Sequence, residues 1–141
     1  MKIVINRCYG GFSLSYEGVM YYAKLKGIKL YAYVEKREDG LYTHKPYKPA
    51  KRTIVPFEKR KDEGEPVIIH YATKEVRDIK ELNKYYWSMF NIKRDDPALV
   101  KTVEDLGERA SGIFSELKVV EVPDGIDWEI TEYGGMEEVE W

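Results

Sequence analysis

Two clusters of side chains have the types and spacing that bind an anionic, planar ligand. The first is the segment from Arg7 to Ser15, RCYGGFSLS, which joins an expected strand to the start of an expected helix. Adjacent glycines let backbone N–H groups approach an anion, and the hydroxyls and the helix start add donors. Arg7 can hold a phosphate with two hydrogen bonds, and Phe12 and Ser13 belong to the same segment. A Gly-Gly turn before a capped helix is also ordinary architecture, so both interpretations stay open.

A second cluster of aromatic, amide and basic side chains follows near the end of a later helix. It contains Trp87, Phe90, Asn91, Lys93 and Arg94. An aromatic ring can stack on a nucleobase, an amide can bind a base edge, and a cation can bind phosphate. The competing interpretation places the rings in the core and the cations on a solvated turn. Arg109 is equally ambiguous, because the dipole at a helix end already favours a cation there.

Other kinds of site have little support in the sequence. His44, His70 and the single cysteine, Cys8, do not stand at the spacing of metal ligands. Cys8 lacks the local signature of a nucleophile and is expected to be a small core residue. No Walker loop or dinucleotide fingerprint is present. The residues therefore predict a binding protein rather than an enzyme, with no metal and no cofactor.

Charge is divided unequally along the chain. Residues 1–61 carry 14 Lys/Arg against 5 Asp/Glu, a net +9, and residues 62–141 carry 9 against 20, a net −11. The stretch Val119–Trp141 has eight acidic residues and no basic one. A basic half can attract phosphates and an acidic half a basic partner. Equally, the two halves can neutralise each other within one fold or across a dimer.

The compartment follows from cysteine usage and hydropathy. One cysteine cannot form an internal disulfide, which suits a reducing cytoplasm. No apolar run approaches the roughly 20 residues that span a bilayer. The N-terminus MKIVINR also lacks the apolar stretch of a signal peptide. We therefore expect a cytoplasmic protein without membrane contact.

Hydrophobic spacing and capping residues predict the elements that position these side chains. Strands are expected in the first eight residues and at Ile28–Glu35, Val67–Tyr71, Lys118–Val122 and Trp128–Tyr133, with a short one after Gly134-Gly135. Helices are expected at Tyr16–Lys26, between Ser15 and Gly27; at Lys74–Phe90; and from Asp96-Pro97 to a stop at Gly112. The predicted fold class is α+β, with a single mixed or antiparallel sheet flanked by about three helices, in one domain over 1–141.

Residues 38–66 are predicted to form a long, basic, Pro-containing loop, in which Thr53–Phe57 can be a short strand. Its cations and rings can follow a nucleic-acid backbone: Lys45, Lys48, Lys51, Arg52, Tyr42 and Tyr47. The pI of about 5.8 makes a local pocket a better expectation than general nucleic-acid binding. The chain has 12 tyrosines, of which Tyr21-Tyr22 and Tyr85-Tyr86 can line a homodimer interface.

Three segments resemble a widespread group of small phage proteins: KIVINRCYGGFSLS, RDDPALVKTVEDLGERASG and LKVVEVPDGIDWEITEYGG. Within that group, the chain is similar to the phage anti-Thoeris nucleotide sponges of the first type. The resemblance covers both ends and the third expected helix but not the middle loop. It implies a counter-defence protein that sequesters a cyclic ADP-ribose isomer, such as glycocyclic ADP-ribose, without cleaving it.

The resemblance also implies a homodimer with ligand pockets at its interface, and larger homo-oligomers that hold cyclic oligonucleotides. On this chain it assigns Phe90 to adenine stacking, Asn91 to the base or ribose, and Arg94 and Arg109 to phosphate. From the N-terminal segment it adds Arg7, Phe12 and Ser13. Two alternatives stay open. One is an interaction protein that binds a basic host or phage protein through its acidic C-terminal surface; the other is a small hydrolase of the same nucleotide.

Overall fold

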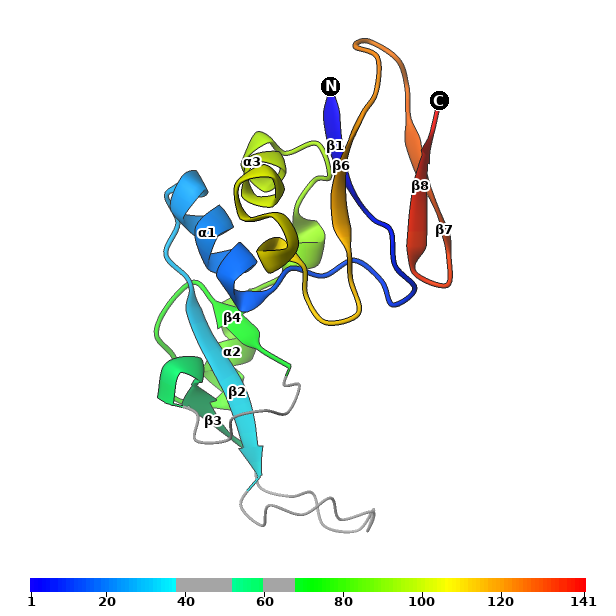
Figure 1. Cartoon of the computed structure of the whole chain (residues 1–141). Coiled ribbons are helices and arrows are strands. Elements are labelled where there is room, and N and C mark those ends of the chain that lie inside the picture. The colour runs from blue at the N-terminus through cyan, green and yellow to red at the C-terminus, as the bar shows by residue number, and fades with distance from the viewer. Residues whose placement is uncertain (38–51, 60–67) are drawn as a thin grey trace. The chain divides into compact units, whose positions relative to one another are not determined.

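The computed structural model describes residues 1–37, 52–59 and 68–141. The chain contains two compact units (Figure 1). Unit 1 comprises Met1–Ile28 and Ser88–Trp141, and unit 2 comprises Lys29–Trp87. The single domain expected over 1–141 stays a prediction.

The α+β fold class is confirmed. The described residues form three α-helices and eight strands, and the paired strands are antiparallel. The expected number of helices is confirmed as well. The expected single sheet is wrong, because the described strands form three separate sheets. Alternation of apolar residues identifies a strand but not its partner, so the division into sheets was not visible in the pattern.

Unit 1 is built in layers around a two-stranded ribbon. β1 (Lys2–Asn6) pairs with β6 (Leu117–Glu121), and Ile3 lies opposite Val120. Figure 1 shows α1 (Tyr16–Lys26) and α3 (Pro97–Leu106) on one side of this ribbon. On the other side lies a hairpin of β7 (Glu129–Tyr133) and β8 (Met136–Glu140).

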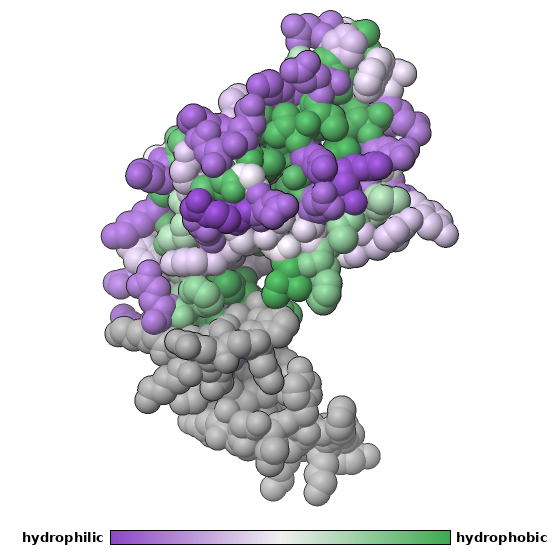
Figure 2. All heavy atoms as spheres, in the orientation of Figure 1, coloured by the Kyte–Doolittle hydropathy of each residue, from purple (hydrophilic) through white to green (hydrophobic). Residues whose placement is uncertain are grey.

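The hairpin is held to the ribbon by apolar packing. A buried core of three residues lies between them: Ile3, Ile5 and Val122. Four partly buried side chains pack against it: Val120, Trp128, Ile130 and Val139. Over unit 1, Figure 2 shows hydrophobic side chains gathered in one area of the surface with hydrophilic ones around it. Apolar side chains of unit 1 are thus partly accessible to a ligand.

The predicted caps of the helices in unit 1 are confirmed with one correction. The Ser15 side chain accepts a hydrogen bond from Gly18 N, and Gly27 ends α1 at a φ of 70°. The Asp96 side chain accepts one from Ala98 N, with Pro97 in the first turn of α3. The expected stop at Gly112 is wrong: α3 ends at Leu106, because Gly107 adopts a positive φ of 58° that suits glycine. A 3₁₀ turn, η3 (Gly107–Ala110), follows.

Unit 2 contains a four-stranded sheet in the order β3-β2-β4-β5. Its strands are β2 (Tyr31–Arg37), β3 (Arg52–Pro56), β4 (His70–Ala72) and β5 (Tyr86–Trp87), and η1 (Phe57–Lys59) follows β3. The buried core consists of Tyr33, Ala72, Val76 and Leu82. The expected short strand near Thr53–Phe57 is confirmed as β3. The expected strands at Ile28–Glu35 and Val67–Tyr71 begin later, at Tyr31 and His70.

The helix expected over Lys74–Phe90 is wrong in its extent. Only α2 (Ile79–Lys84) is α-helical, because Asp78 caps its start by accepting from Glu81 N. The backbone of Tyr86 and Trp87 then pairs with β4. A separate 3₁₀ turn in unit 1, η2 (Met89–Asn91), is capped by Ser88. Apolar residues three or four apart thus belong to three short elements instead of one helix.

Several sequence predictions lie outside the described residues. These are the cations and rings of the middle loop up to Lys51, together with His44. Within the described ranges, no helix has the length and apolar character that would let it cross a membrane.

Candidate functional site

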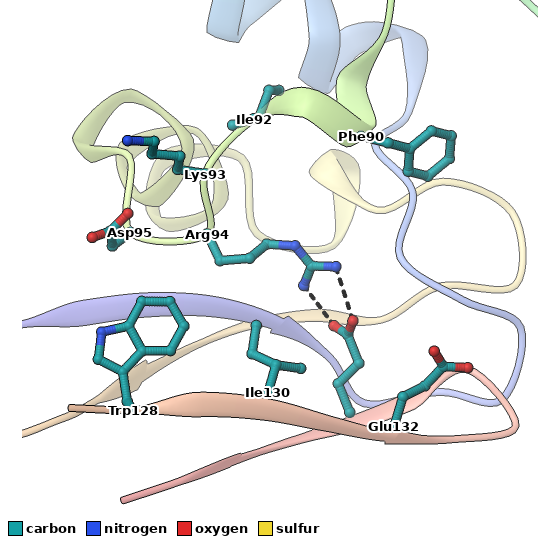
Figure 3. Close-up of a pocket in the computed structure, with 9 residues that line it drawn as sticks. Phe90, Ile92, Lys93, Arg94, Asp95, Trp128, Ile130 and Glu132 are labelled. Carbon is teal, nitrogen blue, oxygen red and sulfur yellow. Dashed lines mark hydrogen bonds and ion pairs between the residues drawn. The ribbon is translucent and has the colours of Figure 1, made fainter.

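A hollow of about 630 Å³ lies in unit 1 between the loop after η2 and the β7–β8 hairpin (Figure 3). Its volume falls within the range of small-molecule sites. The loop side of the lining consists of Phe90, Ile92, Lys93, Arg94 and Asp95. The hairpin side consists of Trp128, Ile130, Glu132 and Glu137. The lining therefore combines apolar and aromatic surface with cations and carboxylates.

The loop side is held in place by backbone hydrogen bonds. Ser88 Oγ accepts from Phe90 N at 3.2 Å, which fixes the start of η2. Val4 N donates to Arg94 O at 2.9 Å, and Asp96 N donates to Lys93 O at 3.0 Å. The loop is therefore attached to β1 at one point and to the start of α3 at another.

The hairpin side follows from strand alternation. Because successive side chains of a strand point to opposite faces, Trp128, Ile130 and Glu132 share one face. Glu137 lies opposite Glu132 in the register and shares that face. In Figure 3 Trp128 and Ile130 rise from β7 toward the loop, and Phe90 and Trp128 lie at opposite ends of the hollow.

The floor of the hollow is a bidentate ion pair between Arg94 and Glu137 (Figure 3). Arg94 Nη1 and Nη2 donate to Glu137 Oε1 and Oε2 at 2.6 and 2.8 Å. Glu137 Oε1 also accepts from Asn6 N at 2.8 Å, and Glu137 is 6% exposed. The Arg94 guanidinium lies 3.8 Å from the centroid of the Phe12 ring. This arrangement connects β1, the loop and the hairpin. It also means that the charges of Arg94 and Glu137 are already paired with each other.

Three polar side chains of the lining remain more accessible. Lys93 is exposed and Asp95 is half-buried, and in the described part of the chain neither side chain has a hydrogen bond or ion pair. Glu132 Oε1 accepts from Gly135 N at 3.0 Å and keeps its other oxygen. Phe90 is 69% exposed. The hollow therefore offers one cation, two carboxylates and an accessible ring to a ligand.

The predicted binding residues fall in three places. Phe90 and Arg94 line the hollow, and Phe12 is buried beneath Arg94. Asn91 is exposed on η2 and is not among the lining residues. Arg7 lies beside the hairpin, where its Nη1 donates to Glu137 O at 2.9 Å and pairs with Glu138 at 3.5 Å.

Ser13 and Arg109 do not line the hollow either. The Ser13 carbonyl accepts from Gly112 N and Ser115 Oγ, at 3.0 and 2.9 Å. Arg109 forms an exposed ion pair with Glu17 at the start of α1. That pair lowers the pKa of Glu17, chiefly through the hydrogen bond from Arg109. In this single chain, Arg109 and Phe90 therefore do not share the hollow.

The glycines of RCYGGFSLS make close backbone contacts. A Cβ on Gly10 would lie 2.3 Å from Phe114 O, and one on Gly135 would lie 2.3 Å from Gly11 N. Asn6 Nδ2 donates to both Cys8 O and Gly135 O, which closes the turn onto the hairpin. These contacts are those of a packed turn. Cys8 itself is a half-buried free thiol.

The hairpin residues of the site were not predicted from the sequence. The signal that could have found Trp128, Ile130 and Glu132 was their shared face on an expected strand. Glu137 was harder to find, because its partner Arg94 lies 43 residues earlier. No group of three or more potential metal ligands occurs among the residues that the structure describes.

The chain was compared with protein-family models, with curated proteins and with solved structures, and none of the three comparisons found a match.

Proposed function

We propose that unit 1 binds a small nucleotide-like molecule in the hollow without cleaving it. The ligand class we propose is a cyclic ADP-ribose isomer, and the role is sequestration of such an immune signal by a phage counter-defence protein. The observation that carries the proposal is the hollow itself, in which the exposed Phe90 ring and the Trp128 indole lie with Lys93 on one surface.

The two rings suit an extended ligand with planar groups. Rings stack on nucleobases without needing a particular hydrogen-bond pattern. Because Phe90 and Trp128 lie at opposite ends of the hollow, a ligand that contacts both must span it (Figure 3). A cyclic ADP-ribose isomer has one purine, which can stack on one of these rings, while its riboses and pyrophosphate extend toward the other.

The charged side chains of the hollow can each be assigned a role toward such a ligand. Lys93 is the accessible cation and is the residue that we assign to phosphate. Arg94 is held by Glu137, so we assign it to shaping the floor rather than to direct phosphate binding. Asp95 and Glu132 can accept hydrogen bonds from ribose hydroxyls or an exocyclic amino group.

Binding without cleavage is consistent with how two of the lining carboxylates, those of Glu132 and Glu137, are engaged. Both carboxylate oxygens of Glu137 already accept hydrogen bonds from Arg94, and one also accepts from Asn6 N, so the group is engaged within the protein. Glu132 accepts from Gly135 N. We therefore propose a binding protein without enzymatic activity; the expected homodimer stays a prediction.

A thermal-shift panel of cyclic nucleotides and cyclic ADP-ribose isomers tests this proposal. A ligand at 100 times its dissociation constant should add about 2.7 kcal/mol of stability. Phe90→Ala and Lys93→Gln should each remove most of the shift. The matched controls Phe114→Ala and Lys118→Gln should keep it, since Phe114 is 73% exposed outside the hollow. No shift with any compound, or recovery of a cleaved ligand after heat denaturation, would overturn the proposal.

A second candidate is an interaction protein that binds a basic partner. It is favoured by the outer face of the β7–β8 hairpin, where Glu129 lies directly opposite Glu140 in the register. Like charges opposite each other destabilise a hairpin, and a basic partner would relieve that repulsion. In a pull-down, Glu129→Gln/Glu140→Gln should then lose the partner, while Phe90→Ala should keep it.

A further inference from the structure

Unit 2 places lysine ammonium groups over tyrosine rings. Lys29 Nζ lies 5.3 Å from the centroid of the Tyr31 ring. Lys74 Nζ and Lys84 Nζ lie 5.0 and 5.4 Å from the centroid of the Tyr85 ring. These distances are within the range of cation–π interactions. Two tyrosine rings of unit 2 therefore each have at least one lysine ammonium group beside them.

Strand register brings a third tyrosine to the same face. Ala72 lies opposite Tyr31 on β2 and opposite Tyr86 on β5, so these three side chains share one face of the sheet. Tyr31 and Tyr85 both pack against the core cluster that contains Ala72. Tyr86, on the edge strand, is 54% exposed. We call this surface the tyrosine–lysine face; it consists of Lys29, Tyr31, Lys74, Lys84, Tyr85 and Tyr86.

The backbone that carries two of these rings is held by hydrogen bonds. Tyr85 N donates to Glu81 O at 3.1 Å, and Tyr85 O accepts from Thr73 N at 3.0 Å. Backbone pairing with β4 fixes Tyr86. The Cα positions of Tyr85 and Tyr86 are therefore fixed, and an aromatic side chain has few torsions to order when a ligand binds.

The cations of this face lack local neutralisation. Lys74 and Lys84 Nζ lie over one ring, so they are at most 10.4 Å apart, the sum of 5.0 and 5.4 Å. Within the described ranges, Lys29, Lys74 and Lys84 form no ion pair. Nearby Glu81 is already 3.8 Å from Arg77. The ammonium groups of Lys74 and Lys84 are therefore both available to a bound anion.

Net charge also differs between the two units. Unit 2 has 14 Lys/Arg and 10 Asp/Glu, a net +4, whereas unit 1 has 9 and 15, a net −6. The acidic pI of the whole chain is therefore a property of unit 1. Unit 2 taken alone is basic, and this charge favours an anionic ligand such as nucleic acid.

We propose that the tyrosine–lysine face binds single-stranded nucleic acid. Its ammonium groups meet the phosphodiester backbone, and the exposed ring of Tyr86 stacks on an unpaired base. An acidic protein segment would satisfy the lysines but would leave the ring unused. A base-paired duplex keeps its bases stacked on one another. The face lies in unit 2 and is independent of the hollow in unit 1.

Fluorescence anisotropy of the full chain with labelled dT and U oligomers of about 15 nucleotides tests the proposal. Lys29→Gln/Lys74→Gln/Lys84→Gln should weaken binding at least about tenfold and lower the salt slope by about 2, for three lost phosphate contacts. Tyr86→Ala should weaken binding about tenfold without changing that slope, as expected for one lost stack. The dT and U arms show whether DNA, RNA or both bind.

The matched control is Lys24→Gln/Lys101→Gln/Lys118→Gln, which removes the same charge from unit 1. It should bind within about twofold of the unaltered chain, and Phe90→Ala should also have no effect. Unfolding midpoints of all variants should agree, which excludes misfolding. No anisotropy change at about 100 μM protein, the weak end of non-specific binding, overturns the proposal. So does equal loss in the control, or competition by polyglutamate as strong as by dT of equal charge.

Discussion

Neutralising Glu137 by Glu137→Gln should destabilise unit 1 strongly while keeping the shape of the side chain. Glutamine can still accept from Asn6 N, but the Arg94 guanidinium loses its charged partner. Arg94 is 21% exposed and Glu137 8% exposed at the side chain, so water replaces the partner only in part. Breaking a buried pair by removing one member costs about 3–5 kcal/mol. Because Arg94 retains some exposure, we expect about 3 kcal/mol.

Urea unfolding followed by circular dichroism measures this change. The matched control is Glu17→Gln, which breaks the exposed pair with Arg109 and should leave the midpoint unchanged within error. Adding Arg94→Met to Glu137→Gln should recover part of the lost stability, because no unpaired charge then remains. A loss below about 0.5 kcal/mol for Glu137→Gln, or no recovery in the double variant, would refute the role assigned to this pair.

Three further predictions follow from packing and capping. Gly10→Ala should destabilise by about 2 kcal/mol or more in urea unfolding, since its Cβ would lie 2.3 Å from Phe114 O and its φ is +153°; an unchanged midpoint would contradict this. Leu99→Ala should cost about 2–5 kcal/mol in the same assay, because Leu99 is 0% exposed and a cavity would remain; a smaller loss would show that the site collapses. Burial alone would raise the pKa of Asp96, but hydrogen bonds, chiefly from Tyr22, hold it below its ordinary value of 3.8. Its contribution to stability is therefore present above about pH 4 and lost as pH falls below it, and Asp96→Asn should flatten that part of a pH series of urea midpoints.

Local signals in the sequence predicted the ends of helices well. As expected, Ser15 caps the start of α1 and Gly27 its end, and α3 begins at Asp96 and Pro97. Each of these features depends on hydrogen bonds or φ values within a few residues. For that reason, a single sequence contains the information that specifies them.

Non-local pairing was not accessible in the same way. The apolar spacing through Val76 and Leu82 is compatible with a long helix, but the backbone of Tyr86 and Trp87 pairs with β4 instead. That pairing depends on residues far away in the sequence, and periodicity does not report it. The same limit explains why one sheet was expected where three form.

The candidate site contains one part that the sequence predicted and one part that it did not. The local cluster around Phe90 and Arg94 does line a hollow, as its residue types indicated. Its partners on the hairpin lie more than thirty residues later, and Glu137 rather than a ligand engages Arg94. The sequence therefore indicates that an arginine will pair with an anion. It does not indicate whether that anion is a carboxylate of the protein or a group of a ligand.

The most direct test of ligand binding in the hollow is an NMR titration of the ¹⁵N-labelled chain with a cyclic ADP-ribose isomer. We predict that the indole N–H signal of Trp128 and the backbone signals of Phe90 and Lys93 shift together and saturate at one affinity. Signals of unit 2 should stay in place. Unchanged signals at all three residues at saturating ligand, or shifts confined to other parts of unit 1, would contradict the account.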